Sequence, residues 1–320
     1  MRLMRWLALV CLIVLAVDAR AQSYPVKPIR YLVTTSPGAG ADTVGRTVAA
    51  GLTEVLGQQV IVENRAGAAG NIGAEIAAKA PPDGYTIFQV AFAHSVNPSI
   101  YRNVAYDLAR DFAPITQLGS APGIIVVHPS LPVKSLAGLV KLAKAKPGAI
   151  NYASAGTGSP TNIGAELLKS VAGIDLMHVP YRGGGEAITS IVSGETSVYV
   201  APLATALPHV ATGRVRPLAV TSATRIAVAP DVPTVAELGY AGAESGLWHG
   251  LMVPARTPKQ TIATLHVAAL AALKRPDVAR RLNDMGYTIV GDQPEQFAQF
   301  LQAEIEKWRK VVRAIGLKAE

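Results

Sequence analysis

Residues 29–64 read IRYLVTTSPGAGADTVGRTVAAGLTEVLGQQVIVEN, and this stretch decides the fold class. Ile29–Thr35 predicts a short strand, and Asp42–Leu56 predicts a helix because apolar residues recur at every fourth position. Val60–Glu63 predicts a second strand. A strand, a glycine-rich turn, a helix and another strand in this order are typical of α/β proteins.

A second stretch, Gly156–Tyr181, has the same plan. Each stretch opens with Gly-x-Gly after a strand, runs through a helix (Asn162–Ala172 in the second), reaches a glycine and re-enters an apolar strand. The likeness indicates either an internal repeat or only the ordinary recurrence of strand–turn–helix units in α/β proteins. A repeat would give two similar lobes, each with a glycine-rich turn at a helix N-terminus.

The composition excludes several classes of protein. The chain has 320 residues, which suits two lobes of roughly 100–200 residues each, and a single cysteine, which excludes a disulfide scaffold. Its net charge is +8, but the lysines and arginines are scattered and are not interleaved with aromatic residues. We therefore expect no nucleic-acid partner, and the positive field would instead attract small anions.

The N-terminus has the pattern of a cleavable signal peptide over residues 1–21. A basic start is followed by the uncharged run Trp6–Val17 and by Ala19-Arg20-Ala21, a small-x-small cleavage motif. The alternative is a buried N-terminal helix. The run is shorter than the roughly 20 residues that a membrane span requires. Cleavage after Ala21 would remove Cys11 and leave an exported protein without a thiol.

Familiar enzyme signatures are incomplete in this sequence. The segment Gly156–Thr161 has threonine where a dinucleotide-binding fingerprint needs its third glycine, and Arg46 replaces the lysine of a phosphate loop. The chain has no G-x-S-x-G or His-Glu-x-x-His motif, and its six histidines lack the spacing of metal ligands. We expect no catalytic residue, cofactor or metal site, although an enzyme assembled from distant residues stays an alternative.

The two glycine-rich turns are the positive signal. A helix N-terminus presents unpaired N–H groups and a partial positive charge, so it binds an anion without a basic side chain. Glycine allows the ligand to approach the backbone closely. Two such turns facing each other would suit a ligand with a carboxylate at each end; alternatively, they are only tight turns. Hydroxyl groups around the two turns come from Ser36, Thr43, Ser154, Thr157 and Ser159.

Short motifs spread over the mature chain carry a resemblance to a known family. They include VENRAGAAGNIG at residues 62–73, PDGY at 82–85, NYAS at 151–154, HVPYRG at 178–183 and DVPTV at 231–235. With these motifs in this order, the sequence resembles the periplasmic solute receptors of tripartite tricarboxylate transporters, the Bug family.

The resemblance implies an α/β, two-lobed periplasmic binding protein of the Venus-flytrap, type II-like kind, with two crossing hinge strands. It places lobe 1 at residues 22–123 and 248–320 and lobe 2 at residues 124–247, after the signal peptide at 1–21. It implies a monomeric periplasmic receptor, not an enzyme, that captures a small organic carboxylate for the membrane subunits of a tripartite tricarboxylate-type transporter. The alternatives are a ligand-binding sensor partner of a two-component system and an exported carboxylate-processing enzyme.

The resemblance also implies that residues 36–43 and 154–159 clamp the ligand. Arg182 would contact the carboxylate or is a surface arginine, and Phe92 would stack on an aromatic ligand or belongs to the core. The predicted ligand-binding residues are Ser36, Gly38, Ala39, Gly40, Asp42, Thr43, Phe92, Ser154, Gly156, Thr157, Gly158, Ser159, Asn162, Arg182 and Ala201.

Three of these positions depart from the family pattern. Ala39 stands where the family usually has a second glycine, and its methyl group would crowd the pocket. Asn162 stands where many members have histidine. Ala201 stands near the place where many members have an aspartate that would favour an ammonium group. We therefore expect a dicarboxylate or an aromatic acid as the ligand, not an amino acid.

Overall fold

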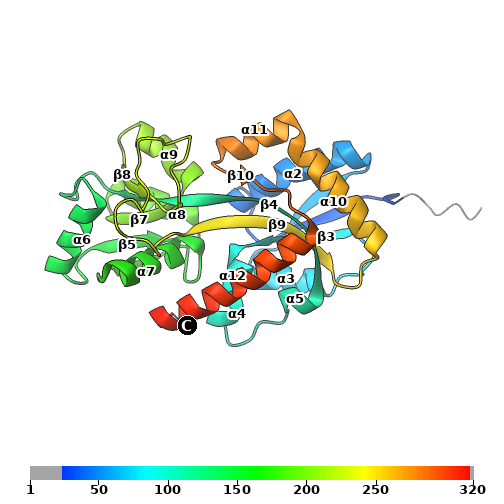
Figure 1. The fold of residues 1–320 in the computed structure, drawn as a ribbon, viewed down its shortest axis with the longest axis horizontal. Helices are drawn as coiled ribbons and strands as arrows, with labels where there is room; N and C mark the ends of the chain where they lie inside the picture. Colours follow the sequence, from blue (N-terminus) through cyan, green and yellow to red (C-terminus); the bar gives the residue numbers. More distant parts are fainter. Residues whose placement is uncertain (1–23, 318–320) are drawn as a thin grey trace, which may run out of the picture.

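The computed structural model describes residues 24–317, so the expected signal peptide lies outside the described residues. Strands and helices alternate along most of the chain (Figure 1). In chain order the elements are β1 (Ile29–Val33), α2 (Gly40–Leu56), β2 (Val60–Asn64), the 3-10 turn η1 (Ala68–Gly70), α3 (Asn71–Ala78), β3 (Thr86–Ala91), α4 (Phe92–Ile100), α5 (Leu108–Asp111), β4 (Phe112–Val127), α6 (Leu136–Ala145), β5 (Asn151–Ser154), α7 (Pro160–Ala172), β6 (Met177–Pro180), α8 (Gly184–Ser193), β7 (Val198–Pro202), α9 (Leu203–Ala211), β8 (Arg216–Val220), β9 (Gly246–Pro254), α10 (Lys259–Lys274), α11 (Pro276–Asp284), β10 (Thr288–Ile289) and α12 (Pro294–Ile315).

Strand β4 belongs to both lobes. Over its first part, as far as Pro122, it pairs antiparallel with β9, and from Gly123 onwards it pairs with β7 and β8 instead. Figure 1 shows β4 and β9 running side by side between two separate groups of helices. The prediction of a two-lobed α/β fold is confirmed, and the residue boundaries given above for the lobes stay a prediction.

The two lobes repeat one strand order. The first sheet runs β2-β1-β3-β9-β4, with β10 beyond β4, and the second runs β6-β5-β7-β4-β8. In both, the first three strands are parallel to one another, and the fourth runs antiparallel to them. The matching order favours the internal repeat over the chance recurrence of strand–turn–helix units.

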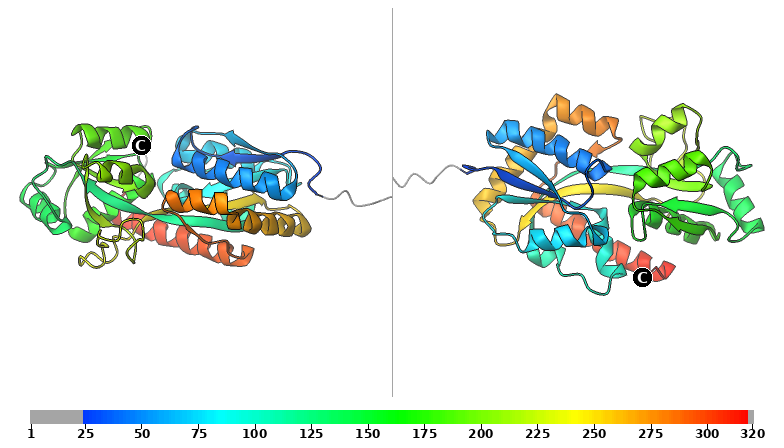
Figure 2. Two further views of the ribbon diagram at one scale, coloured as in Figure 1. Left: turned by 90° about the horizontal axis from the view of Figure 1, so that it is seen from above. Right: turned by 180° about the vertical axis from the view of Figure 1, so that it is seen from behind.

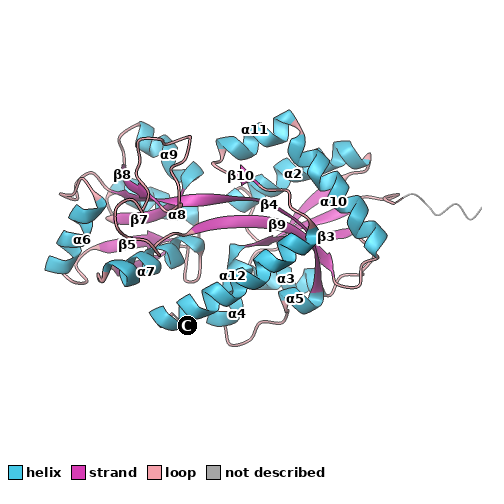
Figure 3. Cartoon of the chain, viewed as in Figure 1, coloured by secondary structure: helices cyan, strands magenta, loops and turns pink. Residues whose placement is uncertain are grey.

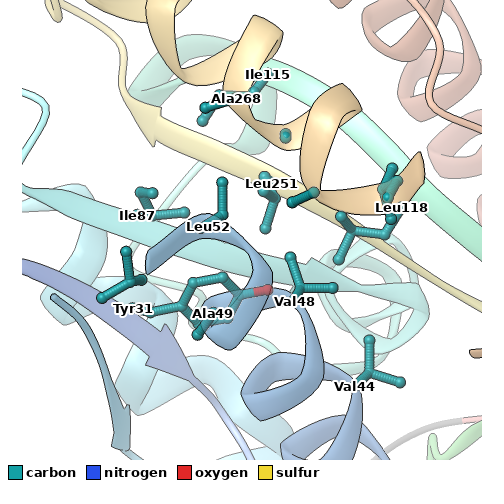
Figure 4. Packing of buried hydrophobic residues seen from close by; sticks show 14 of the residues in the cluster. Tyr31, Val44, Val48, Ala49, Leu52, Ile87, Ile115, Leu118, Leu251 and Ala268 are labelled. Atoms are coloured by element: carbon teal, nitrogen blue, oxygen red, sulfur yellow. The ribbon is translucent and has the colours of Figure 1, made fainter. Parts of the chain in front are cut away.

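Helices cover both faces of each sheet (Figure 3). On one face of the first sheet, α2 and α10 pack over the strands; Val44, Val48 and Leu52, which gave the helical spacing, are fully buried there (Figure 4). Helices α3, α4 and α12 cover the opposite face. In the second sheet α6 and α7 lie on one face and α8 and α9 on the other.

Candidate functional site

The pairing directions fix where the glycine-rich turns lie. Strand β1 is parallel to β3, and β3 and β4 are both antiparallel to β9, so β1 runs with β4 and ends toward lobe 2. Strand β5 is parallel to β7, which runs against β4, so β5 ends toward lobe 1. The first turn (residues 36–43) and the second turn (residues 154–159) thus leave their sheets toward the opposite lobe, which Figure 2 shows for the first. Ligands of α/β proteins bind at such strand ends.

The two turns share one hydrogen-bonding scheme. Gly38 and Gly158 have left-handed φ angles of 82° and 78°, and each is followed by the N-cap residue of a helix. The Gly38 amide donates to Asp42 Oδ2 at 2.8 Å, and the Gly158 amide donates to Asn162 Oδ1 at 3.0 Å. Asp42 and Asn162 are therefore buried residues that hold their own turns, and these two glycine amides are not free for a ligand.

Other amides of both turns stay free. Within residues 24–317, the N–H groups of Gly40, Ala41 and Asp42 at the start of α2 have no acceptor in the chain. The same holds for the N–H groups of Thr157 and Thr161 around the start of α7. These groups are the donors that a helix N-terminus offers to an anion.

The first turn already contains a negative charge. Asp42 accepts hydrogen bonds from Arg46 Nε at 3.0 Å and from Asn64 Nδ2 at 2.8 Å besides that from Gly38. Burial raises the pKa of Asp42, but the hydrogen bonds from Arg46, Gly38 and Asn64 outweigh burial and lower it overall. The carboxylate stabilises α2 through the helix dipole and weakens the attraction of this helix end for a second anion.

The second turn is held by neutral groups. The Ser159 hydroxyl caps α7 by accepting from the Asn162 amide at 3.3 Å. The Thr161 hydroxyl accepts from the Ala155 amide at 2.9 Å, and the Ser154 hydroxyl accepts from the Gly156 amide at 3.1 Å. With asparagine in the place that Asp42 takes in the first turn, no carboxylate offsets the dipole of α7 there.

The structure brings together a serine and a histidine that the sequence analysis left apart. Ser154 Oγ lies 2.6 Å from His178 Nε2, because β5 and β6 are neighbours and pair Tyr152 with His178. Ser154 is fully buried and already accepts from Gly156, so this pair holds the second turn and is not an exposed nucleophile. Burial lowers the pKa of His178. The HVPYRG motif was the available signal, but its histidine, His178, had no predicted role.

Phe92 and Ala201 lie in the cores. Phe92 is 1% exposed and its ring meets Trp308 edge-on, with centroids 4.8 Å apart, which favours the core alternative. Ala201 is fully buried in the cluster beneath α8 and α9 and pairs with Ile124 of β4. The absence of an aspartate at Ala201 is thus a weaker argument about the ligand than the sequence suggested.

Three further predicted residues are exposed: Ser36 in the first turn, Thr43, whose hydroxyl donates to the Ala39 carbonyl at 3.3 Å, and Arg182, just after β6. Because β6 is parallel to β5, its end also points toward lobe 1. The backbone amide of Arg182 donates to Glu186 Oε2 at 3.1 Å. Its guanidinium makes no hydrogen bond or ion pair within residues 24–317, so it is available to a ligand.

The loop after β2 belongs to a motif of the resemblance, VENRAGAAGNIG at residues 62–73, but had no predicted role. Asn64 joins this loop to the first turn, donating to both Asp42 Oδ1 and the Thr35 carbonyl. Ala68 and Ala69 have left-handed φ angles of 47° and 52°, and Asn97 Nδ2 donates to the Ala69 carbonyl at 3.0 Å. The start of this loop therefore lies beside the first turn.

Residues 24–317 lack two other kinds of feature. That range contains no cluster of three or more histidine, cysteine or acidic side chains placed to bind a metal ion. It also contains no helix with the length and hydropathy needed to cross a membrane.

Comparison with known proteins identifies the family of this chain. Residues 44–317 match the tripartite tricarboxylate transporter family receptor, TctC. The chain belongs to this family. Protein BugT of Bordetella pertussis is 33% identical to it over 306 residues, which cover 95% of this chain and 94% of BugT.

Two solved structures of Rhodopseudomonas palustris proteins have the same fold. Rpa4515 with adipate is 32% identical, with a TM-score of 0.86, and the match covers 92% of this chain and 99% of that one. MatC (Rpa3494) with bound malate is 31% identical, with a TM-score of 0.83, over 90% of this chain and 100% of that one. The chain is a periplasmic binding protein of the TctC type by fold and family.

Proposed function

We propose that this family member is a monomeric periplasmic receptor that binds a small organic carboxylate between its lobes and delivers it to a tripartite tricarboxylate-type transporter. The observation that carries the proposal is the pair of turns with unpaired amides at strand ends that point toward opposite lobes. The adipate and malate named for two relatives support a carboxylate as the ligand.

The free amides supply the binding energy. A hydrogen bond to a charged group contributes about 1.5–3 kcal/mol, and a helix N-terminus adds about 0.3–2 kcal/mol. Several such bonds, after the cost of association, reach about −8 kcal/mol, which corresponds to micromolar affinity. Because backbone amides and not one basic side chain supply most of the binding energy, ligands with different carbon skeletons could share the site if each has one well-placed carboxylate.

The charge difference between the turns orients the ligand. Asp42 places a buried carboxylate at the first turn, paired with the half-exposed Arg46, whereas Asn162 keeps the second turn free of a carboxylate. A ligand carboxylate therefore binds the second turn in preference, with Thr157 and Thr161 as donors. The other end of the ligand, a second carboxylate or another polar group, meets the free amides of the first turn and the side chain of Arg46.

The enzyme alternative rests on one observation, the contact between Ser154 and His178. Hydrolysis would require Ser154 to become accessible and to give up its bond with the Gly156 amide. Release of products from carboxylate esters or amides by the purified protein would support that alternative. A pull-down experiment separates the sensor alternative from the proposed function. A sensor protein would bind a kinase ectodomain when loaded with ligand, whereas a transport receptor would bind the transporter subunits.

A thermal-shift screen against aliphatic dicarboxylates, aromatic acids and amino acids tests the proposal. A ligand at 100 times its dissociation constant adds about 2.7 kcal/mol to the free energy of unfolding, which raises the melting temperature measurably. Calorimetry on the hits then gives affinities. If no organic acid in the panel moves the melting curve, the proposal is wrong.

A further inference from the structure

A basic surface lies at the end of lobe 2 that points away from lobe 1. Strand β4 ends there, β5, β7 and β8 begin there, and α6 connects β4 to β5 across this end. Figure 1 shows α6 at the outermost end of the lobe. The second turn leaves the opposite end of β5, so this surface is separate from the candidate ligand site.

Four lysines surround α6 without an acidic partner nearby in the chain. No aspartate or glutamate occurs between Asp111 and Glu166. Helix α6 buries Leu136, Leu139 and Ala143 against the sheet and turns its polar side outward. The four lysines are exposed and form no ion pair within residues 24–317; they are Lys134, Lys141, Lys144 and Lys146.

Two arginines extend the surface beyond α6. Arg216 begins β8 and donates through Nη1 to the Val133 carbonyl at 2.8 Å, which places it beside Lys134. Arg214 is exposed in the turn between α9 and β8. We call the four lysines and two arginines the basic pole. The acidic residues in the loops at this end of the lobe are Asp175 and Glu195. Positive charge therefore predominates there.

The composition of the basic pole fits a charged bilayer surface better than a folded protein partner. Residues 113–151 contain no Phe, Trp or Tyr, whereas binding energy in protein interfaces is concentrated in aromatic and arginine anchors packed in pockets. Lysine is a hydrated point charge on a flexible stem, so it pairs with phosphate groups without a fixed geometry. Clusters of about four to eight Lys or Arg on an amphipathic helix are typical of surfaces that bind anionic lipid headgroups.

We propose that the basic pole holds the receptor on the anionic phospholipid surface of a membrane, with lobe 2 toward the bilayer. The inference rests on the proposed periplasmic location but not on the proposed ligand, because the contact forms with or without a carboxylate. Ions screen such an attraction over about 8 Å at physiological ionic strength, so the contact is weak and reversible. The receptor thus stays close to membrane subunits and remains able to leave them.

Binding to lipid vesicles tests the proposal. Residues 22–320 are used, because the apolar run Trp6–Val17 would itself bind lipid. The variant Lys141→Gln/Lys144→Gln/Lys146→Gln removes three charges from the basic pole. The matched control, Lys274→Gln/Arg280→Gln/Arg281→Gln, removes three charges from exposed positions on α10 and α11 of lobe 1. The two variants have the same net charge and differ only in where the charge is lost.

We expect the parent to sediment at low ionic strength with mixed phosphatidylglycerol–phosphatidylcholine vesicles and not with pure phosphatidylcholine vesicles. A lysine near an anionic surface contributes about fivefold to the partition coefficient, so the basic-pole variant should bind at least about tenfold more weakly than the parent. The control should stay within about twofold of the parent, because screening limits the attraction of distant charges. Melting curves confirm that each variant folds, and Lys134→Gln/Arg214→Gln replaces the basic-pole variant if that variant does not.

The outcomes separate this inference from the proposed ligand. A parent that does not bind anionic vesicles overturns the inference, and so does an equal loss in both variants, which would show attraction by net charge alone. Binding to polyglutamate but not to vesicles, lost in the basic-pole variant, would indicate an acidic protein partner and also overturns it. Vesicle binding by a parent that binds no carboxylate supports the basic pole and contradicts the proposed ligand.

Discussion

Asn162→Asp gives the sharpest test of where the carboxylate binds. The side chain keeps its shape and its acceptor for the Gly158 amide, which now donates at 3.0 Å to Asn162 Oδ1. It adds a negative charge at the start of α7, as Asp42 does at the start of α2. The variant also removes the bond that Asn162 Nδ2 donates to the Tyr152 hydroxyl at 2.8 Å.

The expected loss of affinity follows from the added charge. Two like charges about 6 Å apart repel by about 3 kcal/mol at an effective dielectric constant of about 20. Salt in the open cleft reduces this value. We therefore expect a dissociation constant about 10 to 100 times higher for a dicarboxylate, with a larger effect at low ionic strength.

Isothermal titration calorimetry at two salt concentrations measures the change, with Asn162→Ala as the matched control. Asn162→Ala also removes the bond to Tyr152 and adds no charge, but it removes the acceptor of the Gly158 amide as well. The electrostatic part is therefore the salt-dependent part of the affinity loss, which we expect in Asn162→Asp and not in Asn162→Ala. Melting curves without ligand confirm that each variant folds. Equal affinities for Asn162→Asp and Asn162→Ala, at either salt concentration, would refute a carboxylate at the second turn.

Three further predictions use the same geometry. Asp42→Asn lowers the free energy of unfolding by about 1.5–3 kcal/mol at pH 7, because the charged hydrogen bonds of the carboxylate are lost. The pKa of Asp42 is lowered in the folded protein, so the stability difference between parent and variant is present above the unfolded pKa of about 3.9. Denaturant titrations should show this difference disappear as the pH falls through the folded pKa. Gly158→Ala lowers the melting temperature more than Gly38→Ala. At both positions the left-handed φ makes a residue with a Cβ about 1–2 kcal/mol less favourable than glycine. Only at Gly158 would the new Cβ also contact another residue, Ile100 Cδ1 at 3.0 Å. Arg182→Ala weakens carboxylate binding more than tenfold by calorimetry without changing the melting temperature of the free protein, and an unchanged dissociation constant would remove Arg182 from the site.

The sequence predicted the parts of the fold that depend on local pattern. Apolar residues at every fourth position between Asp42 and Leu56 gave a helix that starts two residues earlier, at Gly40, because the turn itself supplies the N-cap. Glycine-rich turns after strands marked the ends of β1 and β5, since only glycine tolerates the left-handed φ of Gly38 and Gly158 well.

The sequence could not separate a residue that lines the cleft from one in the core. Phe92 and Ala201 both follow buried strands or lie in them, and periodicity shows which positions are buried but not which neighbour covers them. The contact of Ser154 with His178 depends on the register between β5 and β6, two strands separated by α7 in the chain. The roles of Asp42 and Asn162 had a visible signal, a polar residue four positions after a glycine in both turns.

Division of the donors between two lobes makes closure a consequence of binding. The second turn offers two free amides, Thr157 and Thr161, which contribute about 3–6 kcal/mol to a bound anion. Association costs an estimated 4–15 kcal/mol, so lobe 2 alone holds a carboxylate weakly. Only when the amides of Gly40, Ala41 and Asp42 reach the same ligand does the sum become favourable. Under the proposed function, the ligand would therefore bind a closed form far better than an open one, and the expected population shift follows from where the chain places its unpaired N–H groups.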